Sequence, residues 1–367
     1  MHIILTGATG TLGSQLLFRL LEERFNELNS IWLLVRNKKS VNAAERIQNM
    51  LTSAMAPKFV AQNLQAIQDK LRIIEASEAL QPEYYLDLNQ RYYMVHSAGF
   101  VNLSVNPKDE TQIFEENLSF TKQLFNAFKP YLKKFVYIST AFAAGKQDGV
   151  IGNDYLNNTN AEYRNYYEAS KHAAEKYVAQ QCGESGIEIQ ILRPSVLGGN
   201  ALEKPRFFIS KYMVFYLFAK FFQHKTEQGS VRIQAGNDSN LNIIPTDYAA
   251  KVICKVIDQP VEQLNIVNPI GTHILTGISK ILEAVNFKNY QLTQEIVDSV
   301  GGFETTLEKF YYETIGVHLT PYLTGKPQKW DTQLLESILP LPNFNPEEYL
   351  KANIEYAIDQ KFRNQRW

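Results

Sequence analysis

The sequence predicts an α/β protein built on a doubly wound parallel sheet, because short apolar runs alternate with amphipathic stretches over the first half of the chain. Six apolar runs are predicted to be strands: residues 2–5, 31–35, 71–75, 92–96, 134–139 and 188–192. Four intervening stretches with helical periodicity are predicted to be helices: residues 12–23, 43–55, 112–128 and 163–181. A glycine-rich turn directly after the first run completes a pattern that indicates a Rossmann-type sheet.

The glycine-rich turn predicts a dinucleotide-binding site. Its glycines permit a tight turn and a close approach of the backbone to a pyrophosphate, and the free N–H groups at the start of the following helix favour an anion. The residues expected to contact the dinucleotide here are Thr6, Gly7, Thr9, Gly10, Thr11, Leu12 and Gly13. The alternative is a purely structural loop, which the strand before the turn and the helix after it make less favourable.

The end of the second predicted strand indicates NADPH as the cofactor. NAD-binding proteins carry an acidic residue about 20 positions after the glycine turn, where it binds a ribose hydroxyl. This chain instead has Arg36, followed by Asn37, Lys38 and Lys39, and a guanidinium can bind a 2′-phosphate through two hydrogen bonds. Arg46 is expected to supply a second charge, although Lys38, Lys39 and Arg46 could instead belong to a solvated helix entry.

A tyrosine and a lysine are the candidate reactive pair. Tyr167 and Lys171 are four residues apart on a predicted helix, so they share a face. The Lys171 ammonium is expected to lower the tyrosine pKa from about 10 towards neutral pH and to hold the ribose hydroxyls of the nicotinamide. Thr140, after the fifth strand, would hydrogen-bond the oxygen on which charge develops in a carbonyl reduction while Tyr167 donates the proton. Because 20 tyrosines make such pairs common by chance, the order of glycine turn, Ser139-Thr140 and then Tyr167 with Lys171 carries the prediction.

The bulk composition argues against several classes of function. The net charge of −1 speaks against nucleic acid as a partner, and two cysteines provide no disulfide framework. No histidines or cysteines have metal-ligand spacing, so no metal site is expected. No uninterrupted apolar run reaches the roughly 18 residues of a membrane-spanning helix, and residues 1–10 read as a strand rather than a signal peptide. We therefore expect a cytoplasmic protein without stable membrane insertion.

The alternation of strands and helices ends near residue 200, which predicts two domains. Residues 1–200 are expected to form an NADP-binding domain, to which a strand and a helix return near residues 231–268. Residues 201–367 are expected to form a smaller substrate-binding or lid domain over the carboxyl edge of the sheet. An aromatic-rich stretch at residues 207–222 is predicted to be helical.

These motifs resemble those of the extended short-chain dehydrogenase/reductase superfamily. The resemblance rests on Thr-Gly-x-x-Gly-x-x-Gly at residues 6–13, His-Ser-Ala-Gly at 96–99, Ser139-Thr140, and Tyr167 with Lys171. It implies that the turn after the fourth strand lines the adenosine. The expected cofactor contacts therefore also include His96, Ser97, Ala98, Lys171, Pro194 and Ser195. Asn117 falls where the superfamily usually has a helix asparagine, and a purely local helix role is an equal alternative.

Within that superfamily the chain is most similar to fatty acyl-CoA reductases and to the terminal thioester-reductase domains of carboxylic acid reductases and peptide synthetases. The likeness extends over about residues 1–255 and is carried by four segments: residues 34–36, 96–102, 139–142 and 242–248. Two positions depart from the family pattern. Residues 75–78 stand where a Gly-Asp pair is usual, and Gly99 stands where an alanine is usual. Neither departure involves the proton-transfer residues.

The resemblance implies NADPH-dependent reduction of an acyl thioester, carried on CoA or on a carrier protein, to an aldehyde and, with a second hydride, to an alcohol. The aromatic stretch at residues 204–225 would then form the wall of the acyl site. Ordinary packing of a lid helix or a homodimer contact is an equal alternative for this stretch, and weak docking on a membrane surface is a third.

Three other functions compete with this interpretation: an NAD(P)-dependent sugar-nucleotide epimerase or dehydratase, another aldehyde or ketone reductase of the same class, and a non-enzymatic cofactor sensor or scaffold. Arg36 argues against an epimerase, which is expected to carry an acidic residue near that position. The intact set of Thr140, Tyr167 and Lys171 argues against a protein that has lost turnover.

Overall fold

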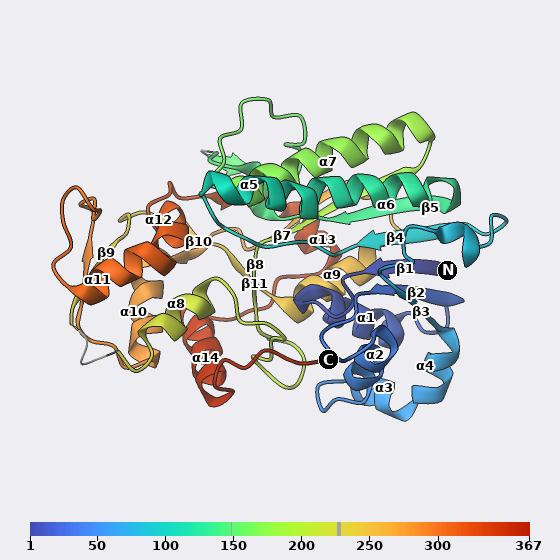
Figure 1. The fold of residues 1–367 in the computed structure, drawn as a ribbon, viewed down its shortest axis with the longest axis horizontal. Helices are drawn as coiled ribbons and strands as arrows, with labels where there is room; N and C mark the ends of the chain where they lie inside the picture. The colour runs from blue at the N-terminus through green and yellow to red at the C-terminus, as the bar shows by residue number, and fades with distance from the viewer. Residues whose placement is uncertain (148, 226–228) are drawn as a thin grey trace.

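A computed structural model describes residues 1–147, 149–225 and 229–367 of the chain (Figure 1). Its centre is a parallel sheet of seven strands in the order β3-β2-β1-β4-β5-β7-β12. These strands are β1 (His2–Thr6), β2 (Ser30–Val35), β3 (Leu71–Glu75), β4 (Tyr92–His96), β5 (Leu132–Ile138), β7 (Glu188–Pro194) and β12 (Gln263–Ile266). The predicted Rossmann-type, doubly wound sheet is therefore confirmed.

Helices cover both faces of this sheet (Figure 1). On one face, α1 (Thr11–Glu23), α2 (Ala43–Leu51) and α9 (Thr246–Val256) pack their apolar side chains against the strands. On the other face, α6 (Phe120–Phe128) and α7 (Tyr166–Ser185) do the same. Because successive strand residues point to opposite faces, the strands from β1 to β7 in this sheet contribute to both cores, whereas β12 contributes only to the first.

The sheet reverses its strand order at β1, which lies between β2 and β4. Ligands of such sheets bind in the crevice outside the carboxyl ends of the strands at this switch point. Thr6, the last residue of β1, pairs with His96, the last residue of β4. The turns that follow these two strands therefore begin side by side at the carboxyl edge.

All six predicted strands are present within two residues of their predicted bounds. The sequence analysis expected a returning strand only somewhere near residues 231–268 and gave no bounds for β12, because β12 has only four residues and includes the polar Asn265. The predicted helix at residues 112–128 is longer and interrupted: α5 (Pro107–Phe114) and α6 are joined by a π-helical segment, Glu115–Ser119. The predicted helix at 163–181 begins only at Tyr166, because Asn165 caps it.

The C-terminal part of the chain forms a second core beside the carboxyl edge of the sheet (Figure 1). Its helices are α8 (Phe215–Phe222), α10 (Ile274–Ala284), α11 (Thr306–Tyr311), α12 (Val317–Leu323) and α14 (Pro346–Asp359). Its paired strands are β9 (Val231–Gln234) with β14 (Tyr290–Thr293), and β10 (Asn240–Leu241) with β13 (Thr272–His273). By contrast, α9 and β12 return to the central sheet, where α9 packs on α1 and β12 pairs with β7.

Short elements complete the fold. They are α3 (Lys58–Gln62), α4 (Leu64–Lys70), α13 (Gln333–Ile338), β6 (Val150–Ile151) with β15 (Lys329–Trp330), and β8 (Val196–Gly198) with β11 (Ile243–Pro245). The predicted helix over residues 207–222 is wrong for its first eight residues. Phe207 and Val214 both have positive φ, which a helix cannot contain, so α8 starts at Phe215. Within the described residues, no helix has the length and apolar character needed to cross a bilayer.

Candidate active site

A cavity of about 590 Å³ runs from the glycine turn, past the carboxyl ends of β4, β5 and β7, into the helices of the C-terminal part. At the end nearest the glycine turn it is lined by Gly10, Thr11, Leu12, Gly13, Arg36, Ser97 and Ala98. In its middle it is lined by Ser139, Thr140, Tyr167, Lys171, Pro194 and Ser195. Residues predicted from three distant parts of the sequence therefore meet in one space.

The glycine turn has the shape of a dinucleotide cradle. Gly7 adopts a positive φ of 73°, and the Gly10 N–H donates to the Gly7 carbonyl at 2.8 Å, which closes the turn. A Cβ atom at Gly13 would lie 2.1 Å from the Gly7 oxygen, so only glycine fits there. The backbone is thus open towards the cavity at the start of α1, where free N–H groups favour a diphosphate.

Two predicted cofactor residues lie behind the turn and hold it in place. The Thr6 hydroxyl lies 2.8 Å from His96 Nδ1 and accepts the Ala98 N–H at 3.0 Å. His96 Nε2 lies 3.0 Å from the Thr121 hydroxyl. Burial, and to a smaller extent the nearby Lys171, lowers the pKa of His96 to about 3, so this imidazole is neutral at physiological pH. Thr6 and His96 join β1 to β4, whereas Ser97 and Ala98 line the cavity.

The arginines predicted to bind phosphate have different surroundings. The Arg36 side chain is 79% exposed at the cavity, with its Nη1 atom 3.9 Å from Glu116 Oε2. Arg46 is buried and donates to the Trp367 carbonyl at 2.9 Å, the Arg36 carbonyl at 2.5 Å and the Thr9 hydroxyl at 2.7 Å. Arg46 and Thr9 therefore brace the turn, and their predicted contact with the cofactor stays a prediction.

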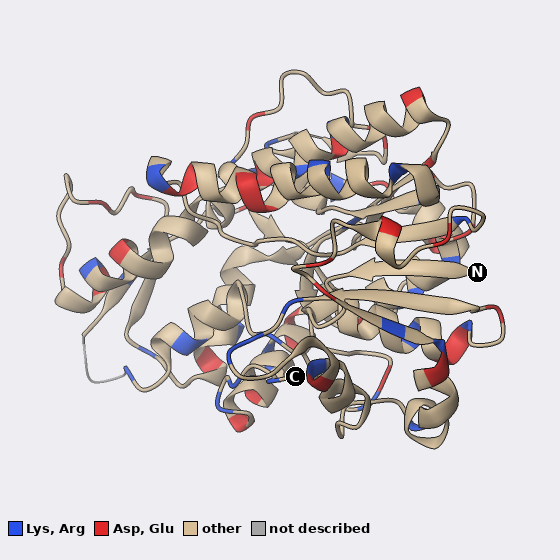
Figure 2. Ribbon diagram, turned by 45° about the vertical axis from the view of Figure 1, so that its right-hand side comes forward, with Lys and Arg blue, Asp and Glu red and all other residues tan. Residues whose placement is uncertain are grey.

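Lys211 is a cation at this end that the sequence analysis missed. It lies on the segment before α8 and lines the cavity. Its pKa is lowered, first because partial burial removes water from the ammonium and then because Lys38, Arg36 and Arg46 repel it. The concentration of Lys and Arg in loops beside the C-terminal end of the chain is visible in Figure 2. No local pattern in the sequence relates Lys211 to Arg36, because they are 175 positions apart.

The predicted reactive residues converge in the middle of the cavity. Tyr167 is the second residue of α7, whose first turn is capped by Asn165 Oδ1 accepting the Glu168 N–H at 3.0 Å. Thr140 follows β5, and its hydroxyl forms a hydrogen bond with Tyr167. Lys171, one helical turn after Tyr167, also lines the cavity. These residues stand beside one another as the i, i+4 spacing and the strand order predicted.

The predicted direction of the tyrosine pKa is wrong for this structure. The pKa of Tyr167 is raised, chiefly because the phenol is buried and further because Glu168 lies nearby, while the hydrogen bond with Thr140 opposes the shift. Burial also lowers the pKa of Lys171 to about 7, against an opposing effect of Glu175. Desolvation therefore outweighs the ammonium, and Tyr167 retains its proton at neutral pH.

Asn117 connects the π-helical segment to the site. Its Oδ1 atom accepts the Phe100 N–H at 2.8 Å, and its Nδ2 atom donates to the Phe100 carbonyl at 3.1 Å and to the Ser170 hydroxyl at 3.0 Å. Asn117 thus joins the loop that lines the cavity to the residue before Lys171 on α7. Its role extends beyond its own helix.

Two hydroxyl groups in the middle of the cavity have no hydrogen-bond partner among the described residues. Ser139 and Ser195 follow the neighbouring strands β5 and β7, and both are more than nine-tenths buried. Buried hydroxyls without partners are uncommon, because each loses its hydrogen bonds to water. Both hydroxyls can form hydrogen bonds with polar atoms of a bound molecule. Their position is compatible with a dinucleotide that extends from the glycine turn to Pro194.

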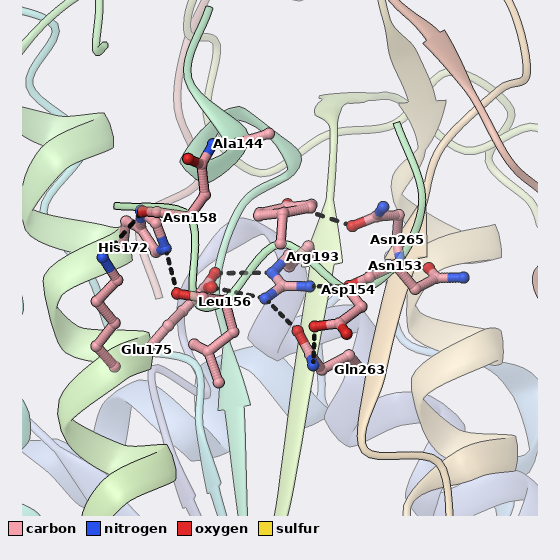
Figure 3. A network of polar contacts seen from close by, with 12 residues as sticks. Ala144, Asn153, Asp154, Leu156, Asn158, His172, Glu175, Arg193, Gln263 and Asn265 are labelled. Carbon is pink, nitrogen blue, oxygen red and sulfur yellow. Dashed lines mark hydrogen bonds and ion pairs between the residues drawn. The ribbon is translucent and has the colours of Figure 1, made fainter. Parts of the chain in front are cut away.

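A buried ion pair fixes α7 against the sheet (Figure 3). Arg193 donates to both carboxylate oxygens of Glu175, at 2.9 and 2.7 Å, and also to the Asn153 carbonyl and the Gln263 side chain. Glu175 stands one helical turn after Lys171. Removing one partner of such a pair costs about 3–5 kcal/mol, because the other charge is left buried. The pair therefore determines how the helix that carries Tyr167 sits on β7.

The far end of the cavity is apolar. One complete face of α10 lines it through Ile274, Gly277, Ile278 and Ile281, which have the i, i+3, i+4, i+7 spacing. Helices α8, α12 and α14 add the remaining wall through Phe215, Phe218, Leu319, Leu323 and Leu350. A pocket of this kind accepts an apolar group and offers few polar atoms to any other ligand.

Comparison with known proteins identifies the family. The family model described as male sterility protein matches residues 5–253, which is more than half of the chain. This chain belongs to the male sterility protein family. The matched part of this family member contains all the predicted site residues, whereas α10, α12 and α14 lie beyond it.

Curated relatives of this male sterility family member are reductases by name. Fatty acyl-CoA reductase 1 of Mus musculus is 28% identical over 233 residues, which cover 54% of this chain and 44% of the relative. A putative fatty acyl-CoA reductase of Drosophila melanogaster is 24% identical over 275 residues, which cover 67% of this chain and 50% of that protein. The chain thus spans about half the length of the curated relatives it matches.

Solved structures share the fold of this male sterility family member at low identity. The terminal R domain from the myxalamid PKS-NRPS pathway matches with a TM-score of 0.66 and 18% identity, covering 99% of this chain and 91% of that one. The UDP-glucuronic acid 4-epimerase of Bacillus cereus matches with a TM-score of 0.63 and 19% identity, covering 98% and 100%. The predicted extended short-chain dehydrogenase/reductase fold, and the closer likeness to acyl and thioester reductases, are confirmed.

The aromatic stretch that was predicted to form an acyl wall lines the cavity only in part. Of the aromatic residues at 204–225, Phe215 and Phe218 line the cavity. The others pack into the two cores: Phe208, Tyr212, Tyr216, Phe221 and Phe222 are buried there. The aliphatic face of α10 lines much of the cavity instead. The sequence did not indicate this, because a buried helix face and a ligand-lining face have the same apolar spacing.

Proposed function

We propose that this protein uses NADPH to reduce an acyl thioester, carried on CoA or on a carrier protein, to an aldehyde and a free thiol. The observation that carries the proposal is the continuity of one cavity. It joins the glycine turn, the cluster of Thr140, Tyr167 and Lys171, and the apolar end beneath α10. A dinucleotide and an acyl group can therefore enter from opposite ends and meet at Tyr167.

The cofactor end fits a dinucleotide with an additional phosphate. The turn from Gly7 to Gly13 would hold the diphosphate, Ser97 and Ala98 would line the adenosine, and Ser139 and Ser195 would hydrogen-bond the nicotinamide end. Arg36 and Lys211 would bind the 2′-phosphate together, because both side chains line the cavity. The two cations repel each other when no phosphate lies between them. When bound, NADPH supplies the hydride that the reduction requires.

Tyr167 is the proposed proton donor. Its raised pKa keeps the proton on Oη until negative charge develops on the substrate carbonyl oxygen a hydrogen bond away. Thr140 would donate a second hydrogen bond to that oxygen. Once the hydride has added to the carbonyl carbon, transfer of the Oη proton to the carbonyl oxygen gives a hemithioacetal, and Tyr167 regains its proton from water. Its carbon–sulfur bond then breaks, the hydroxyl proton passes to the departing sulfur, and an aldehyde and a thiol remain. Further reduction to an alcohol would use the same residues on the aldehyde.

The apolar end supports an acyl substrate over a sugar nucleotide. The name of the curated relatives, fatty acyl-CoA reductase 1, points to the same class of substrate. The epimerase likeness concerns the fold alone. A pyranose carries hydroxyls around its ring, and the side chains of Ile274, Ile278, Ile281 and Leu350 offer them no hydrogen bonds.

The purified protein tests this proposal when it is mixed with NADPH and acyl-CoA esters of increasing chain length. We expect loss of NADPH absorbance and formation of aldehyde or alcohol. Tyr167→Phe should reduce turnover by about 100- to 10,000-fold while NADPH affinity stays nearly unchanged. The proposal is wrong if neither CoA esters nor phosphopantetheine-linked thioesters are reduced. Tightly bound NAD in the purified protein, together with epimerisation of a UDP-sugar, would establish the epimerase alternative.

A further inference from the structure

Tyr322 is a cavity residue that neither the sequence analysis nor the family match includes. It lies on α12, in the C-terminal part, and faces the same space as Tyr167. The family model ends at residue 253, so this tyrosine belongs to the part of the chain beyond it. Its pKa is raised well above the ordinary value by burial and then by Glu168, so the phenol is neutral.

The Tyr322 hydroxyl contacts the first turn of α7 at two points. It accepts a hydrogen bond from Asn165 Nδ2 at 2.7 Å, and it lies close enough to the Glu168 carboxylate for each group to shift the pKa of the other. Asn165 caps α7 two residues before Tyr167, and Glu168 directly follows Tyr167. One hydroxyl from α12 therefore contacts the residues on both sides of the proposed proton donor.

The Tyr322 ring contacts the other reactive segment. It packs edge-on against Phe142, two residues after Thr140, with ring centroids 5.5 Å apart. The guanidinium of Arg164 lies over the ring at 5.3 Å and also donates to Glu168, at 3.3 Å from Nη1. Glu168 is fully buried, so this donor contributes to keeping its carboxylate satisfied. Tyr322 thus touches neighbours of both Thr140 and Tyr167.

We propose that Tyr322 is a positioning residue that sets the orientation of Tyr167 by bridging α12 to the capped first turn of α7. This inference rests on the proposed role of Tyr167 as proton donor. Through this bridge, α12 holds the Tyr167 phenol beside Thr140. The same helix lines the acyl end of the cavity. A small displacement of a reactive group costs on the order of 100-fold in rate, which is why such a bridge matters.

Tyr322→Phe tests the bridge, because it keeps the ring and removes the hydroxyl. We expect kcat for acyl-CoA reduction to fall about tenfold or more, while KM and NADPH affinity change by less than about twofold. Amide hydrogen exchange in the first turn of α7 should become faster. Tyr312→Phe is the matched control, since the Tyr312 hydroxyl also contacts two polar groups, the Gln234 N–H at 2.9 Å and the Arg232 carbonyl at 3.0 Å, away from α7.

Asn165→Ser completes a double-mutant cycle. Serine keeps the helix cap, but its side chain is too short to replace the Asn165 amide that donates to Tyr322, so the double variant should lose about as much activity as the less active of the two single variants. Additive losses, an unchanged kcat in Tyr322→Phe, or the same loss in Tyr312→Phe would overturn the proposal. A lower kcat without faster exchange would also overturn it, because the hydroxyl would then act on the substrate directly. If the wild-type protein reduces no thioester, the proposed function fails, and the exchange comparison by itself decides whether Tyr322 holds α7.

Discussion

Lys171 donates a hydrogen bond from its ammonium nitrogen to the carbonyl oxygen of Ile138 at 2.8 Å. Ile138 is the last residue of β5, two residues before Thr140, so this bond ties the α7 lysine to the strand that delivers the threonine. The same ammonium lies 4.2 Å from the centre of the Tyr137 ring. The contacts with β5 therefore fix the position of the Lys171 ammonium. Tyr167 lies one helical turn before Lys171 and also lines the cavity.

The buried lysine predicts a pH-dependent stability. The pKa of Lys171 is about 7 in the folded protein and 10.5 when the side chain is unperturbed. Between these values the unfolded chain binds more protons than the folded one, so stability rises with pH in this window, by up to about 1 kcal/mol per pH unit. In Lys171→Met, this rise of the unfolding free energy with pH should be absent. Urea unfolding at pH 7 to 9.5 measures it, with Lys255→Met, an exposed lysine on α9, as the control. Parallel curves for wild type and Lys171→Met would contradict the prediction.

The cation pair at the glycine turn predicts the choice of cofactor. Arg36→Met and Lys211→Met should each weaken NADPH binding about tenfold or more, because a hydrogen bond to a charged group contributes about 1.5–3 kcal/mol. NADH affinity should change by less than about twofold, since NADH has no 2′-phosphate. Fluorescence titration without substrate measures both, with Lys220→Met, an exposed lysine on α8, as the control. Equal losses for the two cofactors would mean that these cations bind the diphosphate instead.

Gly277 predicts which acyl groups fit. A Cβ atom at this position would lie 3.3 Å from Leu350 Cδ2 and 3.4 Å from Thr272 Cγ2, so a larger side chain must occupy the cavity. Gly277→Leu should lower kcat/KM for the longest acyl-CoA esters by about tenfold or more and leave the shortest nearly unaffected. Thr276→Leu, on the exposed side of α10, is the control. A uniform loss at all chain lengths would show that the acyl group does not reach α10.

The sequence by itself determined the features that depend on local geometry. Alternation of apolar runs and helical periodicity identified six strands, because burial on both faces of a parallel sheet demands such runs. The glycine turn could be recognised because the Gly13 position admits no Cβ. Tyr167 and Lys171 could be paired because 3.6 residues per turn place them on one face.

Only the tertiary structure decided which distant residues meet and how deeply they are buried. Lys211 lies near Arg36, and Tyr322 contacts Asn165, across 175 and 157 sequence positions, so no local pattern relates them. The partners of Arg46 could not be read from the sequence, and the packing brings it to Trp367 and Thr9. The Tyr167 pKa rises rather than falls because desolvation depends on the whole surrounding shell of atoms, which the order of residues does not reveal.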